Sequence, residues 1–315
     1  MSQANTPAAG PLVLTGPLPG LAAALEAAGF RVLRWPRNAE ELARVQAAAG
    51  EIEAIAAQGG VRPPRGVMDA AARLSLICCV GAGYEAYDPQ ALAARGVRLA
   101  NGGGANGEDV ADMALALLLA ARRQVTAFDR EVRGGRWAPR MVSRIRGRKL
   151  GVLGLGSIGQ AVAQRAEAFG MEVGWYGPNP KSVKWPRLES PMALAQWADD
   201  LAVTCRPTPE NERLVGADML RALGPNAIVV NVARGSVVDE PALIEALKAG
   251  VIGGAGLDVF AAEPTDSALW AEIPNVVLTP HVGSATHESI GDLRDLCVEN
   301  LRRHFAGEAL LTPLN

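Results

Sequence analysis

The sequence predicts an α/β fold with two doubly wound parallel-sheet domains, and three observations support this. The chain has 315 residues, about twice the ~100–200 residues of an average domain. Short apolar segments alternate with segments of helical period along most of its length, a pattern typical of βαβ units. A glycine-rich turn at residues 154–159 lies between an apolar segment and a helical one, as at the first turn of a nucleotide-binding sheet.

The first hundred residues contain the first set of alternating elements. We expect strands at Leu12–Thr15, Arg31–Leu33, Ile52–Ala57, Leu74–Val80 and Val97–Ala100. Helical spacing of apolar residues predicts helices at Leu21–Ala28, Glu40–Ala49 and Met68–Arg73. This region therefore predicts one parallel sheet with helices between its strands.

A long helix and a basic segment precede the second set of elements. The helix is predicted from Gly107 to Phe128, and the basic segment, Arg133 to Lys149, is interpreted as a solvated loop. Further strands are expected at Gly151–Leu153, Glu172–Tyr176, Leu201–Cys205, Ala227–Val232, Ala255–Leu257 and Val276–Leu278. The remaining predicted helices are Ile158–Phe169, Pro241–Lys248 and Glu288–Phe305.

Composition and charge exclude several classes of protein. The 31 Lys and Arg residues nearly balance 33 Asp and Glu, whereas nucleic-acid proteins show a basic excess. The longest apolar run, Met113–Ala121, has nine residues, and a membrane span needs about 20. The N-terminus has no signal-peptide pattern. The four cysteines, at 78, 79, 205 and 297, form no CxxC pair, so we expect a reduced cytoplasmic protein without a metal site.

The turn Gly154-Leu155-Gly156-Ser157-Ile158-Gly159 is the sharpest local signal. An apolar strand precedes it and a helix follows it, which is the context that a dinucleotide-binding turn requires. Gly154 would permit the tight turn, Gly156 the approach of a pyrophosphate, and Gly159 close packing of helix on strand. The alternative is a glycine-rich turn with a purely structural role.

The second strand ends without the acid that binds the ribose of NAD about 20 residues after the turn. Gly177 stands at this position, followed by Asn179 and Lys181. A carboxylate would repel a 2′-phosphate, so its absence favours NADP(H) over NAD(H). Lys181, with Lys184 as a second candidate, would pair with the phosphate, and Asn179 would donate a hydrogen bond; alternatively, both lysines are ordinary surface residues. Arg206, after another strand, is a weaker candidate near the adenosine.

Three further segments carry residues suited to chemistry after predicted strands: Arg234, Asp258 with Glu263, and His281. Ligands of open parallel sheets bind beyond the carboxyl ends of the strands. Each residue has an ordinary alternative, namely a surface ion pair, a turn residue or a structural histidine. Their joint occurrence behind a dinucleotide turn makes those alternatives improbable. Only two other histidines, His287 and His304, are present.

The chain resembles the D-isomer-specific 2-hydroxyacid dehydrogenase family, and within it the glyoxylate/hydroxypyruvate reductases. The matching motifs occur in the family's order along nearly the whole chain. They are the residues 80–84 (VGAGY), 109–112 (DVAD), 154–159 (GLGSIG), 231–235 (NVARG), 256–260 (GLDVF), 263–264 (EP) and 280–281 (PH). Gly177 departs from the NAD-type pattern, which puts NAD specificity in doubt and leaves the family resemblance intact.

The resemblance implies a role for each matching residue. His281 would protonate the substrate carbonyl oxygen, and Glu263 would pair with its ring. Arg234 would bind the substrate carboxylate and carbonyl through its planar fork. The backbone N–H groups of Ala82 and Gly83 would bind the carboxylate. Asp258 would hold the nicotinamide amide, and further cofactor contacts would come from Ser157, Ile158, Cys205, Arg206, Val232, Ala233, His281 and Gly283.

The resemblance also implies a domain organisation and an assembly. Residues 1–100 with 285–315 would form a flavodoxin-like substrate-binding domain, and residues 101–284 a Rossmann dinucleotide-binding domain. The active site would lie in the cleft between them. The family's usual homodimer uses the region of Gly107–Arg146, and the apolar helix there fits this expectation.

The expected function is NADPH-dependent reduction of a small 2-oxo acid, glyoxylate or hydroxypyruvate, to the D-2-hydroxy acid. The acid at position 263 favours carbonyl reduction, because formate dehydrogenases of this family carry Gln there. One alternative is a dehydrogenase for a bulkier 2-oxo acid, and another is a non-catalytic NADP-sensing module. No local motif identifies the pocket for the substrate's third carbon, for which Tyr84, Trp137, Met141 and His287 are candidates.

Overall fold

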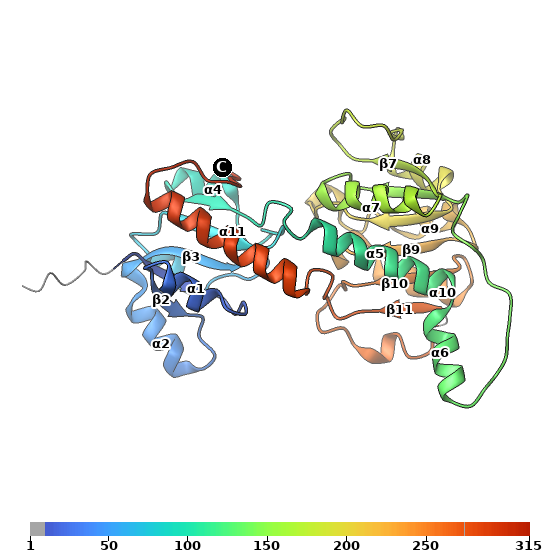
Figure 1. Cartoon of the computed structure of the whole chain (residues 1–315), viewed down its shortest axis with the longest axis horizontal. Helices are drawn as coiled ribbons and strands as arrows, with labels where there is room; N and C mark the ends of the chain where they lie inside the picture. Colours follow the sequence, from blue (N-terminus) through green and yellow to red (C-terminus); the bar gives the residue numbers. More distant parts are fainter. Residues whose placement is uncertain (1–9, 274) are drawn as a thin grey trace, which may run out of the picture. The chain divides into compact units, whose positions relative to one another are not determined.

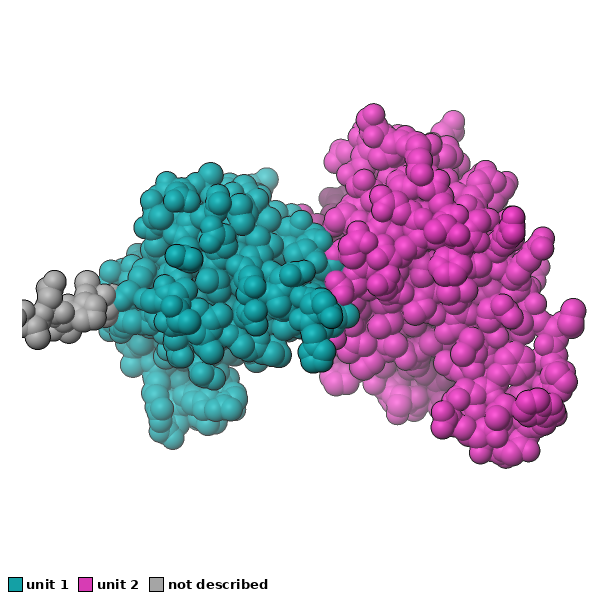
Figure 2. Space-filling view, viewed as in Figure 1, with its two compact units in different colours: residues 1–106, 286–315 teal, residues 107–285 magenta. Residues whose placement is uncertain are grey.

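The computed structural model describes residues 10–273 and 275–315. The chain divides into two compact units, which Figure 2 distinguishes by colour. Unit 1 comprises residues 1–106 and 286–315, and unit 2 comprises residues 107–285. The C-terminal segment therefore belongs to the same unit as the N-terminal residues.

Unit 1 contains a five-stranded parallel sheet with helices on both faces (Figure 1). Its order is β2-β1-β3-β4-β5, the order of flavodoxin-like sheets, which confirms the predicted fold class. The strands are β1 (Leu12–Thr15), β2 (Arg31–Arg34), β3 (Ile52–Gln58), β4 (Leu76–Val80) and β5 (Arg98–Ala100). Side chains alternate across this sheet and give it two cores. Helices α1 (Leu21–Ala27) and α11 (His287–Phe305) line one core, and α2 (Ala39–Ala47), α3 (Val67–Ala70) and α4 (Pro89–Ala94) line the other.

Unit 2 contains a six-stranded parallel sheet in the order β11-β10-β9-β8-β6-β7. Beyond β7, residues 186–188 add a short parallel bridge between Trp175 and Arg187. With this segment counted as a reduced third strand, the sheet has the 3-2-1-4-5-6 order of dinucleotide-binding domains, and β11 follows as a seventh strand. The strands are β6 (Lys149–Leu153), β7 (Glu172–Tyr176), β8 (Asp200–Val203), β9 (Ile228–Asn231), β10 (Gly254–Leu257) and β11 (Val276–Leu278).

Two sets of helices cover the faces of the unit 2 sheet (Figure 1). Helices α5 (Gly107–Arg122) and α7 (Ser157–Ala168) contribute to one buried core. Helices α8 (Pro191–Trp197), α9 (Ala217–Leu223) and α10 (Glu240–Lys248) contribute to the other. The chain passes from β6 outward to β7 and then back to β8, so the topological switch point of this sheet lies between β6 and β8.

The predicted single helix over 107–128 is wrong. Helix α5 ends at Arg122, and α6 (Val125–Arg133) begins after Gln124, whose φ of 52° is left-handed. A left-handed residue interrupts the i to i−4 hydrogen bonds and redirects the chain. The sequence analysis also missed the short helices α4, α8 and α9, while the basic loop at 134–148 has no regular element.

The division between the units also differs slightly from the expected one. Unit 1 extends to Asn106 instead of residue 100, and unit 2 ends at Ala285 instead of residue 284. Residues 101–106 stay with unit 1 because they hydrogen-bond to its loop after β4. Gly102 N donates to Gly81 O at 2.7 Å, and Asn101 Nδ2 donates to Ala82 O at 2.7 Å. Helix α5 then begins at Gly107.

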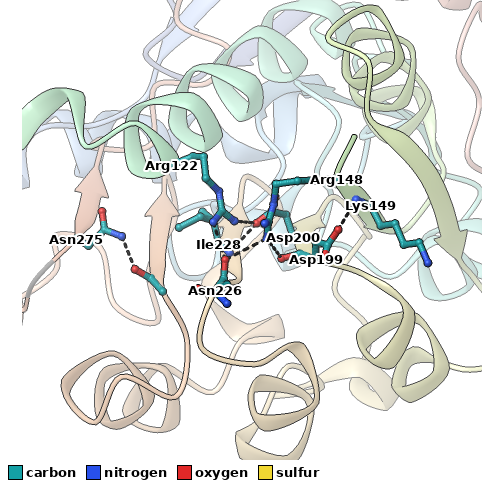
Figure 3. Close-up of polar contacts among 9 residues, drawn as sticks. Arg122, Arg148, Lys149, Asp199, Asp200, Asn226, Ile228 and Asn275 are labelled. Atoms are coloured by element: carbon teal, nitrogen blue, oxygen red, sulfur yellow. Dashed lines mark hydrogen bonds and ion pairs between the residues drawn. The ribbon is translucent and has the colours of Figure 1, made fainter. Parts of the chain in front are cut away.

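A buried ionic cluster ties together the amino ends of three strands in unit 2 (Figure 3). The carboxylate of Asp200, at the start of β8, is fully buried and accepts hydrogen bonds from Arg122, Arg148 and the backbone N–H of Ile228. Both guanidinium groups also donate to the carbonyl of Asn226. Burial raises the pKa of Asp200, and the two arginines act to lower it. These bonds link the end of α5 to the starts of β6, β8 and β9.

No helix among residues 10–273 and 275–315 is long and apolar enough to cross a bilayer.

Substitution of Asp200 by Asn is expected to destabilise unit 2 by about 3–5 kcal/mol, because it leaves the buried Arg122 without a counter-charge. Urea unfolding followed by tryptophan fluorescence measures this change, since five of the six tryptophans lie in unit 2. Asp218→Asn is the matched control, because Asp218 pairs with Arg221 on the exposed surface of α9. The control should change the free energy of unfolding by less than about 1 kcal/mol. Equal effects of the two substitutions would contradict the assigned role of Asp200.

Candidate active site

The glycine-rich turn joins β6 to α7 and has the sterics of a dinucleotide-binding turn. Gly154 has a left-handed φ of 99°, and a Cβ there would lie 2.4 Å from the Cα of Cys205. A Cβ on Gly159 would lie 2.1 Å from the carbonyl oxygen of Gly154. By contrast, no atom of the described residues lies within 4 Å of a Cβ built on Gly156. The turn therefore excludes side chains where helix and strand meet and leaves space in front of the helix.

The amino end of α7 offers hydrogen-bond donors to that space. Within the described part of the chain, no hydrogen bond uses the backbone N–H groups of Ser157 and Ile158. Such groups at a helix start attract anions. A pyrophosphate therefore fits here, with the space at Gly156 for its approach.

Thr204 fixes the glycine turn from the neighbouring strand. Its buried hydroxyl, just after β8, donates to the carbonyl of Gly154 at 2.6 Å. The next residue, Cys205, is half-buried, and this burial raises the pKa of its thiol to about 11. Cys205 therefore stays a neutral thiol beside the turn. The sequence analysis missed Thr204, whose only signal was its position directly before Cys205 at a strand end.

Beyond β7, the loop that would meet the adenosine carries the predicted residues. Gly177 is buried directly after the strand, and Asn179 and Lys181 are exposed in the loop that follows. Lys184 instead forms an ion pair with Glu167 of α7, with 2.6 Å between Nζ and Oε2. Arg187, which the sequence analysis did not identify, donates from Nε and Nη2 to the carbonyl of Gly177 at 3.0 and 2.9 Å. Arg206 is exposed after β8.

Arg234 follows β9 in a turn that Asn231 holds. The buried amide of Asn231 accepts from Ala233 N at 3.0 Å and donates to the carbonyl of Arg234 at 3.0 Å. Arg234 is half-buried and donates from Nη1 to the carbonyl of Ala233 at 2.7 Å. A Cβ on Gly235 would lie 1.9 Å from the carbonyl carbon of Phe260. The turn after β9 therefore packs directly against the loop after β10.

His281 and Glu263 form a hydrogen-bonded pair. The Nδ1 atom of His281 lies 2.7 Å from Oε2 of Glu263. The other carboxylate oxygen of Glu263 accepts from the backbone N–H of Phe260 at 3.1 Å, which fixes its orientation. The side chains of His281 and Glu263 are 43% and 39% exposed. With Nδ1 toward the carboxylate, Nε2 is the ring atom that can exchange a proton with a ligand.

Asp258 holds the turn that carries His281. Its buried carboxylate accepts from the hydroxyl of Thr279 at 2.6 Å, and from the backbone N–H groups of Val282 and Gly283 at 2.9 and 2.8 Å. Its carbonyl accepts from His281 N at 2.8 Å, where the backbone is left-handed with φ of 54°.

These bonds change the interpretation of Asp258. A carboxylate has about four acceptor positions, and three are used within the protein. At most one remains for the nicotinamide amide that the family resemblance assigned to this residue. The main task of Asp258 in the structure is to position the backbone on which His281 stands.

The loop after β4 in unit 1 contains Ala82 and Gly83. Asn101 holds it through the carbonyl of Ala82, and a Cβ on Gly59 would lie 1.7 Å from the carbonyl oxygen of Gly83. Among the described residues, no hydrogen bond uses the N–H groups of Ala82 and Gly83. The loop therefore has two adjacent donors, which suits an anionic ligand.

Most predicted site residues of unit 2 follow the carboxyl ends of its strands. Val232 and Ala233 are buried after β9, and Gly283 is buried after β11. Because the strands are parallel, their ends share one edge of the sheet, which we call the carboxyl edge. Among the described residues, no group of three or more His, Cys, Asp or Glu side chains is placed to hold a metal ion.

The four candidates for the substrate's third carbon differ in their surroundings. Tyr84 is half-buried after β4, and His287 is exposed at the start of α11, both in unit 1. Trp137 and Met141, in unit 2, are 86% and 98% exposed. Each unit therefore contributes two of the four candidates.

Comparisons with known proteins agree with this arrangement. Residues 115–283 match the family model described as D-isomer specific 2-hydroxyacid dehydrogenase, NAD binding domain. The hydroxyphenylpyruvate reductase of Plectranthus scutellarioides is 37% identical over 84% of this chain and 86% of its own. The glyoxylate/hydroxypyruvate reductase A HPR2 of Arabidopsis thaliana is 35% identical over 90% of this chain and 92% of its own.

Solved structures show the same similarity. One is the NADPH-dependent glyoxylate/hydroxypyruvate reductase of Sinorhizobium meliloti in complex with NADP and malonate. It is 34% identical, with a TM-score of 0.86 over 98% of this chain and 97% of its own.

Substitutions of two glycines should separate binding from folding. Gly156→Ala adds a methyl group to open space, so we expect an unchanged melting temperature and weaker binding of the dinucleotides NADH and NADPH, measured by fluorescence titration. Gly159→Ala adds the same group 2.1 Å from the Gly154 carbonyl, and such overpacking should cost about 1–3 kcal/mol of stability. Thermal unfolding of both variants tests the distinction. A Gly156→Ala protein with lower stability and normal affinity would refute it.

Proposed function

Since the chain belongs to the D-isomer-specific 2-hydroxyacid dehydrogenase family, we propose that it is an NADPH-dependent reductase of small 2-oxo acids, with glyoxylate and hydroxypyruvate as its first substrates. The observation that carries the proposal is the hydrogen-bonded pair of His281 and Glu263. The pair stands at the same carboxyl edge as the glycine turn and Arg234. A proton donor, a cation for a carboxylate and a dinucleotide turn are the parts that carbonyl reduction requires.

The chain's own residues supply binding and the proton. Arg234 binds the substrate carboxylate and carbonyl oxygen through its planar guanidinium, and the N–H groups of Ala82 and Gly83 bind the carboxylate. His281 donates the proton on Nε2 to the carbonyl oxygen, which becomes the hydroxyl of the product. Glu263 stabilises the protonated ring through Nδ1 and keeps it oriented. NADPH, when bound along the Gly154–Gly159 turn, supplies the hydride that the carbonyl carbon receives.

The loop after β7 supports a preference for NADPH over NADH. Gly177 takes the place of the acid that would bind the 2′-hydroxyl and repel a 2′-phosphate. Asn179 and Lys181, exposed in this loop, are proposed to bind the adenosine end together with Arg206. A relative of known structure, from Sinorhizobium meliloti, is described as NADPH-dependent.

A bulkier substrate is the second candidate. It is favoured by the similarity to a hydroxyphenylpyruvate reductase, which is 37% identical to this chain. An aromatic 2-oxo acid would need the same proton donor and carboxylate-binding group, with a wider pocket for the side chain.

A matrix of 2-oxo acids against NADPH and NADH tests these proposals by loss of absorbance at 340 nm. We expect turnover of glyoxylate and hydroxypyruvate with NADPH, and a lower kcat/KM with NADH. His281→Ala should reduce kcat by at least ~10²-fold, the usual scale of general acid catalysis. Highest activity with phenylpyruvate-type acids would favour the second candidate. Tight NADPH binding without turnover of any acid would favour a sensing module.

We propose that the chain forms a homodimer through the expected region, Gly107–Arg146, with the contact on the residues after α5 and not on α5 itself. The apolar helix α5 is buried within unit 2 through Leu115, Leu117 and Leu118. Exposed apolar side chains occur on α6 and the loop after it, namely Val125, Val132, Trp137 and Met141. A second copy of this chain is the proposed partner of this surface, which we call the α6 surface.

Sedimentation velocity measures this assembly directly. The wild-type chain should sediment as a dimer, and Trp137→Ser combined with Met141→Ser should shift it toward monomer, because both exposed apolar groups are removed from the α6 surface. Phe169→Ser is the control, since Phe169 is 47% exposed elsewhere in unit 2. A monomeric wild type, or a dimer unaffected by the double substitution, would contradict the proposal.

A further inference from the structure

Arg187 lies on the reduced third strand of the unit 2 sheet and belongs to none of the sequence motifs described above. Residues 186–188 pair with β7 through two backbone hydrogen bonds. Trp175 N donates to Pro186 O at 3.0 Å, and Leu188 N donates to Trp175 O at 2.8 Å. The parallel bridge sets Arg187 beside Trp175, two residues before Gly177. The backbone of Arg187 is therefore fixed to the strand whose end meets the adenosine ribose in dinucleotide-binding sheets.

The side chain of Arg187 reaches the carboxyl edge and is held there. Its Nε and Nη2 atoms donate to the carbonyl of Gly177 at 3.0 and 2.9 Å, and Nη2 also lies 3.4 Å from the carbonyl of Pro178. The guanidinium carbon lies 5.6 Å from the ring centre of Tyr176 and 6.0 Å from that of Trp175. Two carbonyls and two aromatic rings thus fix the orientation of this exposed cation.

The charge of Arg187 is not neutralised by a neighbouring acid. Among the described residues, no carboxylate lies within ion-pair distance of it, and no hydrogen bond uses Nη1. The neighbouring Lys184, by contrast, is paired with Glu167. Carbonyl oxygens anchor a guanidinium without cancelling its charge, so Arg187 keeps both a positive charge and a donor for an anion.

We propose that Arg187 is the residue that selects NADPH, by binding the 2′-phosphate through its guanidinium group. This inference rests on the proposed NADPH preference and names its structural basis. The guanidinium of Arg187 is bound to the carbonyl of Gly177, the residue that replaces the ribose-binding acid. The end of β7 therefore lacks the carboxylate that would repel a 2′-phosphate and carries a cation that would attract it. A guanidinium presents the planar donor pair that matches a phosphate.

Equilibrium binding to the full chain tests the proposal without turnover. Calorimetric titrations compare NADPH with NADH, and 2′,5′-ADP with 5′-AMP, for wild type, Arg187→Gln, Arg187→Lys and Arg221→Gln. The glutamine keeps a donor for the Gly177 carbonyl and removes the charge. Arg221, an exposed arginine paired with Asp218 on α9, is the matched control for loss of a positive charge from unit 2.

Arg187→Gln should weaken binding of NADPH and 2′,5′-ADP at least ~10-fold, the scale of one charge-assisted hydrogen bond. Its binding of NADH and 5′-AMP should change by less than about twofold. Arg187→Lys should lose less affinity than Arg187→Gln, because it retains a charge, and Arg221→Gln should match the wild type.

Three results would overturn the proposal, and they are distinguishable. Equal weakening of NADPH and NADH by Arg187→Gln would show that Arg187 only shapes the turn at Gly177. A retained NADPH preference in that variant would assign the 2′-phosphate to another residue while leaving the proposed cofactor intact. A wild-type chain that binds NADH as tightly as NADPH would refute the cofactor preference itself, and with it the role of Arg187.

Discussion

The parallel direction of every strand in unit 2 is the constraint on which its site depends. Because all carboxyl ends share one edge, residues after β6, β9 and β11 lie along the same edge without being near in sequence. Where the chain leaves the sheet, its backbone N–H and C=O groups lose their hydrogen bonds to the neighbouring strands and need other partners. Buried polar side chains provide them after β8, β9 and β10, namely Thr204, Asn231 and Asp258.

Hydrogen bonds at this edge explain how His281 and Glu263 are both exposed and fixed. His281 and Glu263 are more than a third exposed, as groups that meet a ligand must be. The backbone of His281, however, is held by the carbonyl of Asp258, and the carboxylate of Glu263 is held by the backbone N–H of Phe260. Such preorganisation favours catalysis, because the reactive groups already have their working orientation and need not reorganise when a substrate binds.

The sequence could predict what short-range sterics and periodicity determine. A Cβ at position 154 or 159 would lie within 2.4 Å of backbone atoms, so only glycine fits at either position. The spacing of these glycines was therefore enough to predict the turn. The break at Gln124 was not predictable, because the apolar period continues across it. The anchoring of Arg187 was not predictable because it depends on how the loop after β7 returns to the sheet. The hydrogen bonds of Asp258 were not predictable because its partners Thr279 and Gly283 are more than 20 residues away.

The two edges of the unit 2 sheet use charge in opposite ways. At the amino edge, the buried Asp200 carboxylate pairs with Arg122 and accepts from a backbone N–H, and Arg122 also donates to a carbonyl, while its buried Nε has no partner among the described residues. Burial raises the pKa of the acid and lowers that of the arginine, and their pairing offsets part of this cost. At the carboxyl edge, the guanidinium of Arg187 is anchored on carbonyl oxygens, which leave its charge intact. A structural charge must be cancelled by its neighbours, whereas a charge that recognises a ligand must be held in place by groups that do not cancel it.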